Sequence, residues 1–241
     1  MISIIIPTYC EEESIEWCLK SIQRQDFEKD RIETIVVDSN SPDNTRAIAT
    51  KYAEKVINIK ARGVGKARNI GAHGAKGNVL LFLDADTVLD PKFLTKLVES
   101  FSDDEVVCVS GAVAGLERRG MLDNLFAVSH YSVMNKVASL SAQLGFPLFP
   151  TVCCACRKSV FQGNGGFDEE LAIGEDLVFS RKMGRAGKCL VNSDAKAYTS
   201  LRRVEKWGLM KTYYTYFRNY FKVFVLDEKP WIQDFPNLQE I

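Results

Sequence analysis

The sequence has no excess of acidic or of basic residues, and it contains no long apolar run. Lys and Arg number 31, and so do Asp and Glu, which gives the 241 residues a formal net charge of zero. Without a net charge there is no overall field to attract nucleic acid or an acidic membrane, so we expect no nucleic-acid partner. No apolar stretch approaches the roughly 20 residues that span a bilayer, and the N-terminus has neither a basic region nor a cleavage site. These absences predict a cytoplasmic protein.

Histidines are scarce and the cysteines are not arranged for pairing: there are 2 His and 7 Cys. An odd number of cysteines argues against a disulfide framework, and Cys153, Cys154 and Cys156 lie almost side by side in one extended segment, which is poor geometry for cross-links. No second Cys or His pair lies at zinc-finger spacing from them. We therefore expect reduced, buried thiols.

What the sequence does contain is an alternation of apolar runs and helical patterns. Hydrophobic residues make up 46% of the chain, enough for one sizeable core. Continuous apolar runs are typical of strands covered on both faces. They occur at residues 2–6, 32–37, 56–59, 79–83 and 106–109. Since the segments between them have helical spacing, the alternation predicts an α/β fold with a Rossmann-like, mostly parallel central sheet flanked by helices.

The second half is less regular. Residues 121–143 and 175–186 have helical patterns, and residues 151–156 look like a strand. The last part of the chain, residues 206–241, combines tyrosines and phenylalanines with Lys and Arg, which predicts a C-terminal amphipathic helix and a tail. Such a helix can pack on the core, or residues 207–226 can contact a membrane surface as a peripheral anchor at its inner face.

Three polar clusters follow three of the predicted strands. They are residues 7–13, 38–43 and 84–86. Because ligands of open α/β sheets bind beyond the carboxyl ends of the strands, these clusters are expected to meet at one edge of the sheet. A single Asp after a strand is often only a helix cap, but three clusters at one edge favour a binding site.

Asp84 and Asp86 are the candidate metal ligands. They are separated by one residue on an extended segment, so both side chains lie on the same side of the chain. Carboxylate oxygens are the ligands that Mg²⁺ or Mn²⁺ prefers, and such an ion can neutralise the charge of a departing diphosphate.

Two further segments suggest chemistry. Residues 62–71 combine glycines, which allow the backbone to approach a ligand, with Arg68 at a position suited to phosphate. Glu175 and Asp176 precede the predicted helix of residues 175–186, either as plain helix-capping charges or as a general base that removes a proton from a hydroxyl acceptor.

With these pieces in order, the sequence resembles the family 2 glycosyltransferases, which have the GT-A nucleotide-diphospho-sugar transferase fold. The resemblance covers roughly residues 1–200. Its motifs are Ser3-Ile4-Ile5-Ile6-Pro7-Thr8-Tyr9 followed by Glu11, Val36-Val37-Asp38-Ser39-Asn40-Ser41-Pro42-Asp43-Asn44-Thr45, Gly65-Lys66-Ala67-Arg68-Asn69-Ile70-Gly71, Asp84-Ala85-Asp86, and Gly165-Gly166-Phe167-Asp168-Glu169 followed by Glu175-Asp176. It implies a GT-A domain over residues 1–205, with a nucleotide-sugar-binding half (1–115) and an acceptor-binding half (116–205).

The resemblance also implies roles for individual residues. Asp84 and Asp86 would hold a divalent cation, Mg²⁺ or Mn²⁺, and Asp176 would be the general base of an inverting displacement, with Glu175 beside it. The donor would be a UDP- or GDP-linked sugar and the acceptor a glycan or a lipid-linked molecule, including a lipid phosphate. The implied donor-binding residues are Pro7, Thr8, Tyr9, Glu11, Asp38, Ser39, Arg68, Asp84, Ala85 and Asp86.

The chain departs from the family pattern in two places. The second strand is followed by Asp38-Ser39-Asn40-Ser41 rather than Asp-Asp-Gly-Ser, and residues 197–200 lack the histidine that many relatives use as a further metal ligand. Two alternatives therefore stay open. One is a haloacid-dehalogenase-like phosphatase with Asp84 as its nucleophile, because residues 84–88 match that motif. The other is a degenerate protein that binds nucleotide or glycan without turnover.

Overall fold

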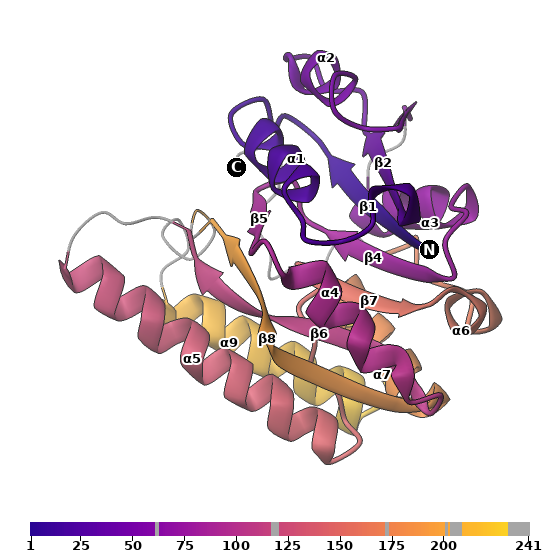
Figure 1. Cartoon of the computed structure of the whole chain (residues 1–241). Coiled ribbons are helices and arrows are strands. Elements are labelled where there is room, and N and C mark those ends of the chain that lie inside the picture. The colour runs from indigo at the N-terminus through magenta and orange to yellow at the C-terminus, as the bar shows by residue number, and fades with distance from the viewer. Residues whose placement is uncertain (61–62, 117–120, 172–173, 201, 203–208, 231–241) are drawn as a thin grey trace.

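The computed structural model describes the whole chain except residues 61–62, 117–120, 172–173, 201, 203–208 and 231–241. The described residues form one twisted sheet of eight strands with helices on both faces (Figure 1). The strands are β1 (Ile2–Thr8), β2 (Ile32–Asp38), β3 (Lys55–Asn58), β4 (Val79–Leu83), β5 (Thr87–Leu89), β6 (Val106–Gly115), β7 (Cys153–Arg157) and β8 (Lys188–Thr199). The helices are α1 (Ile15–Gln23), α2 (Thr45–Ala49), α3 (Val64–His73), α4 (Phe93–Glu99), α5 (Met121–Gln143), α6 (Lys158–Gly163), α7 (Glu175–Ala186) and α9 (Leu209–Tyr220). Short helical turns are η1 (Lys29–Arg31), η2 (Ser100–Ser102) and η3 (Phe221–Val225).

The sheet is mostly parallel, as the sequence predicts. Its order is β3-β2-β1-β4-β7-β6-β8-β5, in which β3, β2, β1 and β4 run parallel, as do β6 and β8. The antiparallel strands are β7, between β4 and β6, and β5, at the edge beside β8. The register of β1 and β2 pairs Thr8 with Asp38, so two of the predicted polar clusters begin side by side at one edge.

Side chains of the central strands alternate between two cores, because successive residues of a strand point to opposite faces. On one face Ile4 and Ile6 pack with residues of α1 and α4. On the other face Ile5 packs with residues of α3, α6 and α7. The continuous apolar runs of the sequence are therefore explained by helices on both sides of the sheet.

β8 was not predicted from the sequence, although it is the longest strand. Its residues Lys188–Thr199 include exposed polar side chains, and its pairing with β6 is irregular between Gly111 and Ala112. The sequence therefore shows neither an apolar run nor a strict alternation there. In contrast, α5 and α7 have the predicted boundaries, and β7 begins two residues later than predicted, at Cys153.

Candidate functional site

Asp38 joins the loops that follow β1 and β2. Its side chain is fully buried and accepts hydrogen bonds from the hydroxyls of Thr8 (3.3 Å) and Ser41 (2.5 Å) and from the Ser41 backbone N–H (3.1 Å). The Ser41 hydroxyl also accepts a bond from the backbone N–H of Cys10 at 3.0 Å. Asp38 thus holds the loops after β1 and β2 together. In these loops Tyr9 is exposed and Ser39 is partly exposed.

Asp84 and Asp86 lie just beyond the carboxyl end of β4, and both are partly exposed. Ala85 between them is buried, so this short segment is anchored to the core. The backbone N–H of Thr87 donates to the Asp84 carbonyl at 3.1 Å, which closes a tight turn around the pair. Asp84 and Asp86 thus lie in a turn and not on the extended segment that the sequence predicted.

Arg68 connects α3 to two of the predicted acidic groups. Its guanidinium donates to Asp84 Oδ1 at 2.9 Å and to Glu175 Oε1 at 2.8 Å, and it lies 5.2 Å from the ring centre of Phe167. Burial alone would lower the pKa of Arg68, but the charges of Asp84, Glu175 and Asp176 outweigh it, so the pKa lies above its ordinary value. Arg68 is therefore a fixed positive charge that holds the two acidic segments together.

The glycines beside Arg68 have a different role from the one expected. A Cβ on Gly71 would lie 2.5 Å from the Ile5 side chain, and one on Gly65 would lie 3.2 Å from the Asp168 carbonyl oxygen. These two positions let α3 pack closely on β1 and on the loop before α7. Protein atoms thus occupy the space at these two positions, whereas a Cβ on Gly63 would meet only Lys66, at 3.9 Å.

Glu175 and Asp176 occupy the first turn of α7. Glu175 is buried at 7% exposure and Asp176 is partly exposed, with one oxygen accepting from the Leu177 N–H at 2.9 Å. The loop between α6 and α7 is anchored near its start, where the Phe167 ring packs edge-to-face on the Phe82 ring with their centroids 4.9 Å apart. The helix dipole stabilises the charged form of a carboxylate in this first turn.

Arg202 and Thr199 are site residues that the sequence analysis missed. Arg202 Nη2 donates to both oxygens of Glu11, at 3.1 and 3.0 Å, and to Asp86 Oδ2 at 3.0 Å. The Thr199 hydroxyl donates to Asp86 Oδ1 at 3.3 Å. Burial raises the pKa of Glu11, and the hydrogen bond from Ser14 and the charge of Arg202 offset only part of this rise. Thr199 is the last residue of β8 and Arg202 follows it, and no sequence pattern predicted where β8 ends.

The edge of the sheet therefore gathers carboxylates around two guanidinium groups. Arg68 and Arg202 each form ion pairs with two of them. The carboxylates around these two groups are Glu11, Asp84, Asp86, Glu175 and Asp176, and the buried Asp38 lies at the same edge. Five carboxylates and two guanidinium groups leave a formal charge of −3, which would repel a diphosphate unless a cation accompanied it.

The donor atoms at this edge fit a hard divalent cation, because Asp84 and Asp86 offer carboxylate oxygens. Within the described residues, however, no three His, Cys, Asp or Glu side chains are gathered so as to hold a metal ion. An ion held by Asp84 and Asp86 would therefore need further oxygens from the ligand that it accompanies.

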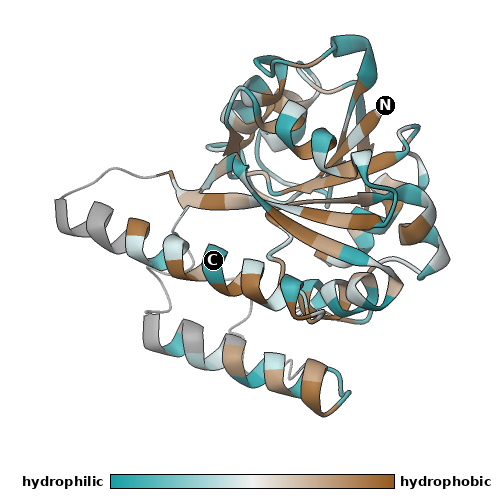
Figure 2. Cartoon of the chain, turned by 60° about the horizontal axis from the view of Figure 1, so that its bottom comes forward, coloured by the Kyte–Doolittle hydropathy of each residue, from teal (hydrophilic) through white to brown (hydrophobic). Residues whose placement is uncertain are grey.

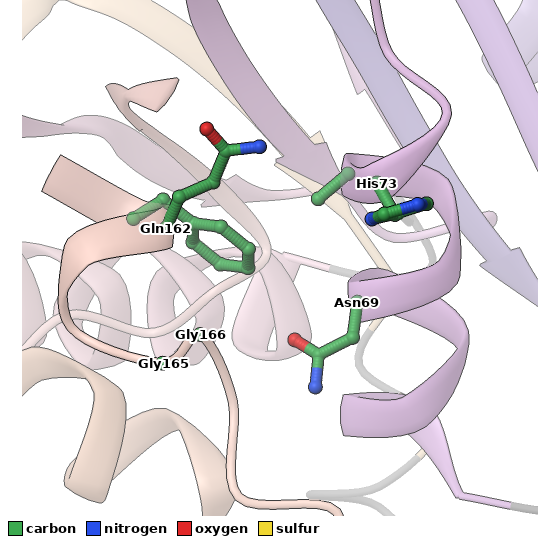
Figure 3. Close-up of a pocket in the computed structure, with 7 residues that line it drawn as sticks. Asn69, His73, Gln162, Gly165 and Gly166 are labelled. Carbon is green, nitrogen blue, oxygen red and sulfur yellow. The ribbon is translucent and has the colours of Figure 1, made fainter. Parts of the chain in front are cut away.

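A shallow hollow lies between α3 and the loop after α6 (Figure 3). It has a volume of about 180 Å³ and is lined by Asn69, Ala72, His73, Phe161, Gln162, Gly165 and Gly166. None of the carboxylates or arginines of the sheet edge lines it. We therefore place the functional site at the sheet edge.

Gly166 beside this hollow positions the loop that leads to α7, and we expect Gly166→Ala to destabilise the protein by roughly 1–3 kcal/mol. Its φ is +60°, and a Cβ there would lie 2.6 Å from Asn69 Oδ1 and 2.9 Å from the Phe161 ring. Asn69 Oδ1 accepts from the backbone N–H of Phe167 at 2.9 Å, so the added methyl would disturb that bond. Urea denaturation measures the change.

Gly163→Ala is the matched control, because nothing lies within 4 Å of its added Cβ. It should raise the free energy of unfolding by up to about 1 kcal/mol, because alanine restricts the unfolded chain and meets nothing in the folded one. Equal stabilities of the two variants would contradict the role given to Gly166.

The comparison with protein families shows which family the chain belongs to. The model of "Glycosyl transferase family 2" matches residues 3–164 of this chain, which include every sheet-edge motif up to Asp86. The chain is a family 2 glycosyltransferase. This membership leaves the phosphatase alternative without support, and Asp84 follows the fourth strand rather than the first, where a phosphatase nucleophile is expected.

Named relatives agree with the family. The poly(ribitol-phosphate) beta-N-acetylglucosaminyltransferase TarS of Staphylococcus aureus (strain Mu50) is 32% identical over 213 residues, which are 83% of this chain and 35% of TarS. Glycosyltransferase AglE of Haloferax volcanii is 29% identical over 195 residues, 78% of this chain and 63% of AglE. This glycosyltransferase thus spans only about a third of the length of TarS.

Solved structures have the same fold. TarS 1–349 of S. aureus in complex with UDP-GlcNAc aligns with a TM-score of 0.66 at 26% identity, over 83% of this chain and 58% of that one. Mannosyltransferase PcManGT from Pyrobaculum calidifontis, in complex with GDP-Man and Mn²⁺, aligns with a TM-score of 0.76 at 20% identity, over 95% and 65%. These likenesses confirm the GT-A fold predicted from the sequence.

Proposed function

We propose that this glycosyltransferase is metal-dependent and moves a sugar from a nucleotide-diphosphate donor to a hydroxyl group of an acceptor. The observation that carries the proposal is the acidic edge of the sheet, where Asp84 and Asp86 lie beside Glu11 and Asp176. The edge suits a diphosphate only together with a divalent cation. The ligands bound in the two solved neighbours, UDP-GlcNAc in one and GDP-Man with Mn²⁺ in the other, support this proposal.

The donor would bind across the loops after β1, β2 and β4. The exposed Tyr9 ring and the partly exposed Pro7 and Ser39 would contact the nucleotide. Thr8 and Asp38 would shape that pocket from beneath, since both are buried and hydrogen-bonded to each other.

Asp84 and Asp86 would hold Mg²⁺ or Mn²⁺ together with oxygens of the donor. The bound ion would neutralise the charge that develops on the departing diphosphate. Asp86 is paired with Arg202, so binding of the cation requires Arg202 to turn away from this carboxylate. Arg202 is 48% exposed at its side chain, which leaves it room to do so.

Asp176 would take the proton of the attacking hydroxyl, and Glu175 would hold Arg68 in place beside it. Attack from the face opposite the leaving diphosphate predicts inversion at the anomeric carbon. The acceptor would be a glycan or a lipid-linked molecule, the latter if the enzyme works at a membrane surface. A protein that binds nucleotide without turnover is the second candidate, since residues 197–200 lack a histidine ligand.

A thermal-shift screen of UDP, GDP, CDP and dTDP, with and without Mn²⁺, tests the proposal. A ligand that binds only the folded state raises the melting temperature. At a ligand concentration of 100 times Kd it raises the free energy of unfolding by about 2.7 kcal/mol. One nucleotide should raise the melting temperature with Mn²⁺ and much less without it. Asp86→Ala should abolish the Mn²⁺-dependent part of the shift.

Asp103→Ala is the matched control, because Asp103 pairs with Lys188 away from the sheet edge. It should leave the Mn²⁺-dependent shift unchanged. No shift for any nucleotide in folded protein would overturn the donor assignment. A shift without donor hydrolysis or transfer would favour the binding protein.

A further inference from the structure

α9 and η3 present apolar side chains to solvent along one stripe. Tyr214, Phe217, Phe221 and Val225 follow one another at intervals of three and four residues, and they are 64%, 71%, 46% and 59% exposed. Residues at this spacing lie on one face of a helix. A helix on the surface of a globular protein normally turns such a face toward the core.

The opposite face of the same helix is turned inward although it begins with polar residues. Thr215 and Asn219 are buried at 4% and 1% exposure, and one turn later Val223 is fully buried. Val223 packs with Leu177 and Val178 of α7, which fixes this orientation. The aromatic stripe therefore faces outward because of how the helix is docked.

A second exposed stripe runs along α5 and just past its end. Val133, Val137, Leu140 and Leu144 are 51%, 45%, 58% and 64% exposed, at intervals of four, three and four residues. α5 is held in place by Asn135, whose amide pairs with both backbone groups of Val113, at 3.0 and 2.9 Å.

α5 and α9 run side by side along one side of the molecule, as both views show (Figures 1 and 2). Apolar residues are visible along both helices in Figure 2. Neighbouring exposed apolar faces of this kind mark an interaction surface rather than an ordinary solvated one. We call the two stripes together the apolar face.

The segments that carry the apolar face contain no acidic residue, neither from Val128 to Phe146 nor from Leu209 to Val225, although acids and bases are equal in the chain as a whole. Their basic residues are Lys136, Lys211, Arg218 and Lys222. Lys136 and Lys211 are exposed, and Lys222 pairs with Glu228 beyond the end of the helix. The surface is thus aromatic and aliphatic with a positive border.

We propose that the apolar face docks on the surface of an anionic phospholipid bilayer. Aromatic and aliphatic side chains would enter the boundary between headgroups and acyl chains, and Lys and Arg would meet the lipid phosphates. None of the described helices is long and apolar enough to cross a membrane.

A second copy of the chain fits this face less well than a bilayer does. Two apolar faces in contact would bring Lys136, Lys211 and Arg218 of both copies together, with no carboxylate of these segments to receive them. Like charges in an interface are repulsive. An anionic lipid surface supplies the missing negative charge.

The docked surface would lie close in the chain to the acidic edge. α9 begins at Leu209, seven residues after Arg202, which contacts Glu11 and Asp86. The docking does not depend on the transferase activity and is measured without donor or metal.

Co-sedimentation of the full chain with vesicles tests the proposal. The vesicles are equimolar phosphatidylglycerol and phosphatidylcholine, with pure phosphatidylcholine for comparison. The wild type should bind the anionic vesicles more strongly than the neutral ones, and less strongly as salt is raised. The double variant Phe217→Ser/Phe221→Ser should partition at least about tenfold more weakly, because two large apolar side chains no longer enter the lipid.

Trp17→Ser is the matched control, because Trp17 is 64% exposed but lies on α1, outside the apolar face. It should bind vesicles like the wild type. Folded wild type that stays in the supernatant, or a double variant that binds as the wild type does, would overturn the proposal. So would a dimer in sedimentation equilibrium that the double variant abolishes, since a second copy would then cover the face. The nucleotide thermal shift should be the same in the wild type and in the double variant, which separates this test from that of the proposed function.

Discussion

Asp176→Asn is expected to lower the rate of sugar transfer roughly 10²- to 10⁴-fold, which is the usual contribution of a general base. The amide keeps the shape of the carboxylate and can still accept the hydrogen bond from the Leu177 N–H. It cannot take a proton from an acceptor hydroxyl. Donor binding, measured as the nucleotide thermal shift, should therefore stay close to that of the wild type, so that the loss appears in kcat.

The control for this variant is Glu170→Gln. Glu170 lies in the loop that leads to α7, but its side chain is 81% exposed and pairs with Lys229. Its rate should change less than about twofold, because an exposed ion pair contributes little. NMR of the product should show an inverted anomeric configuration. A retained configuration, or an Asp176→Asn enzyme with normal kcat, would remove Asp176 from the role of base.

The parts of the fold that the sequence predicted are those in which burial leaves a local pattern. β1, β2 and β4 are covered on both faces, so they are largely apolar despite the buried Ser3, Glu33 and Thr34, and their boundaries are nearly those predicted. β8 is half exposed and interrupted where it meets Gly111 and Ala112 of β6. Its sequence has no regular period, and only its neighbours in the folded sheet make it a strand.

The candidate site shows the same division. The clusters around Asp38 and Asp84 could be placed at one edge because parallel strands bring their carboxyl ends together. Arg202 could not, since it follows the unpredicted β8 and meets Glu11 across 191 positions of the chain. The ion pair of Arg68 with Glu175 spans 107 positions and leaves no local signal either. Long-range charge pairing is visible only once the fold is known.

The same Arg68 gives the largest expected loss of stability. Arg68→Met should lower the free energy of unfolding by about 3–5 kcal/mol, the usual cost of breaking a buried ion pair by removing one partner. The Arg68 side chain is 3% exposed and that of Glu175 is 10% exposed, so water cannot replace the lost charge at Glu175. Asp84 is 31% exposed and contributes less to the loss. Urea denaturation should show a lower midpoint with an unchanged slope.

Two companion variants show whether the loss comes from the unpaired carboxylate. Arg31→Met removes an exposed arginine that pairs with Glu28, and it should cost less than about 1 kcal/mol. Arg68→Met/Glu175→Gln also removes the carboxylate charge that Arg68→Met leaves unpaired. It should recover at least about 1 kcal/mol of the lost stability, because the effects of substitutions at residues in direct contact are not additive. If Arg68→Met proved as mild as Arg31→Met, or if the double variant recovered nothing, Arg68 would not be the charge that holds Glu175 in the site. If the double variant recovers stability but not donor binding, Arg68 both stabilises the fold and binds the donor. The double variant removes the unpaired charge of Glu175, but it does not restore the positive charge of the Arg68 guanidinium beside the donor.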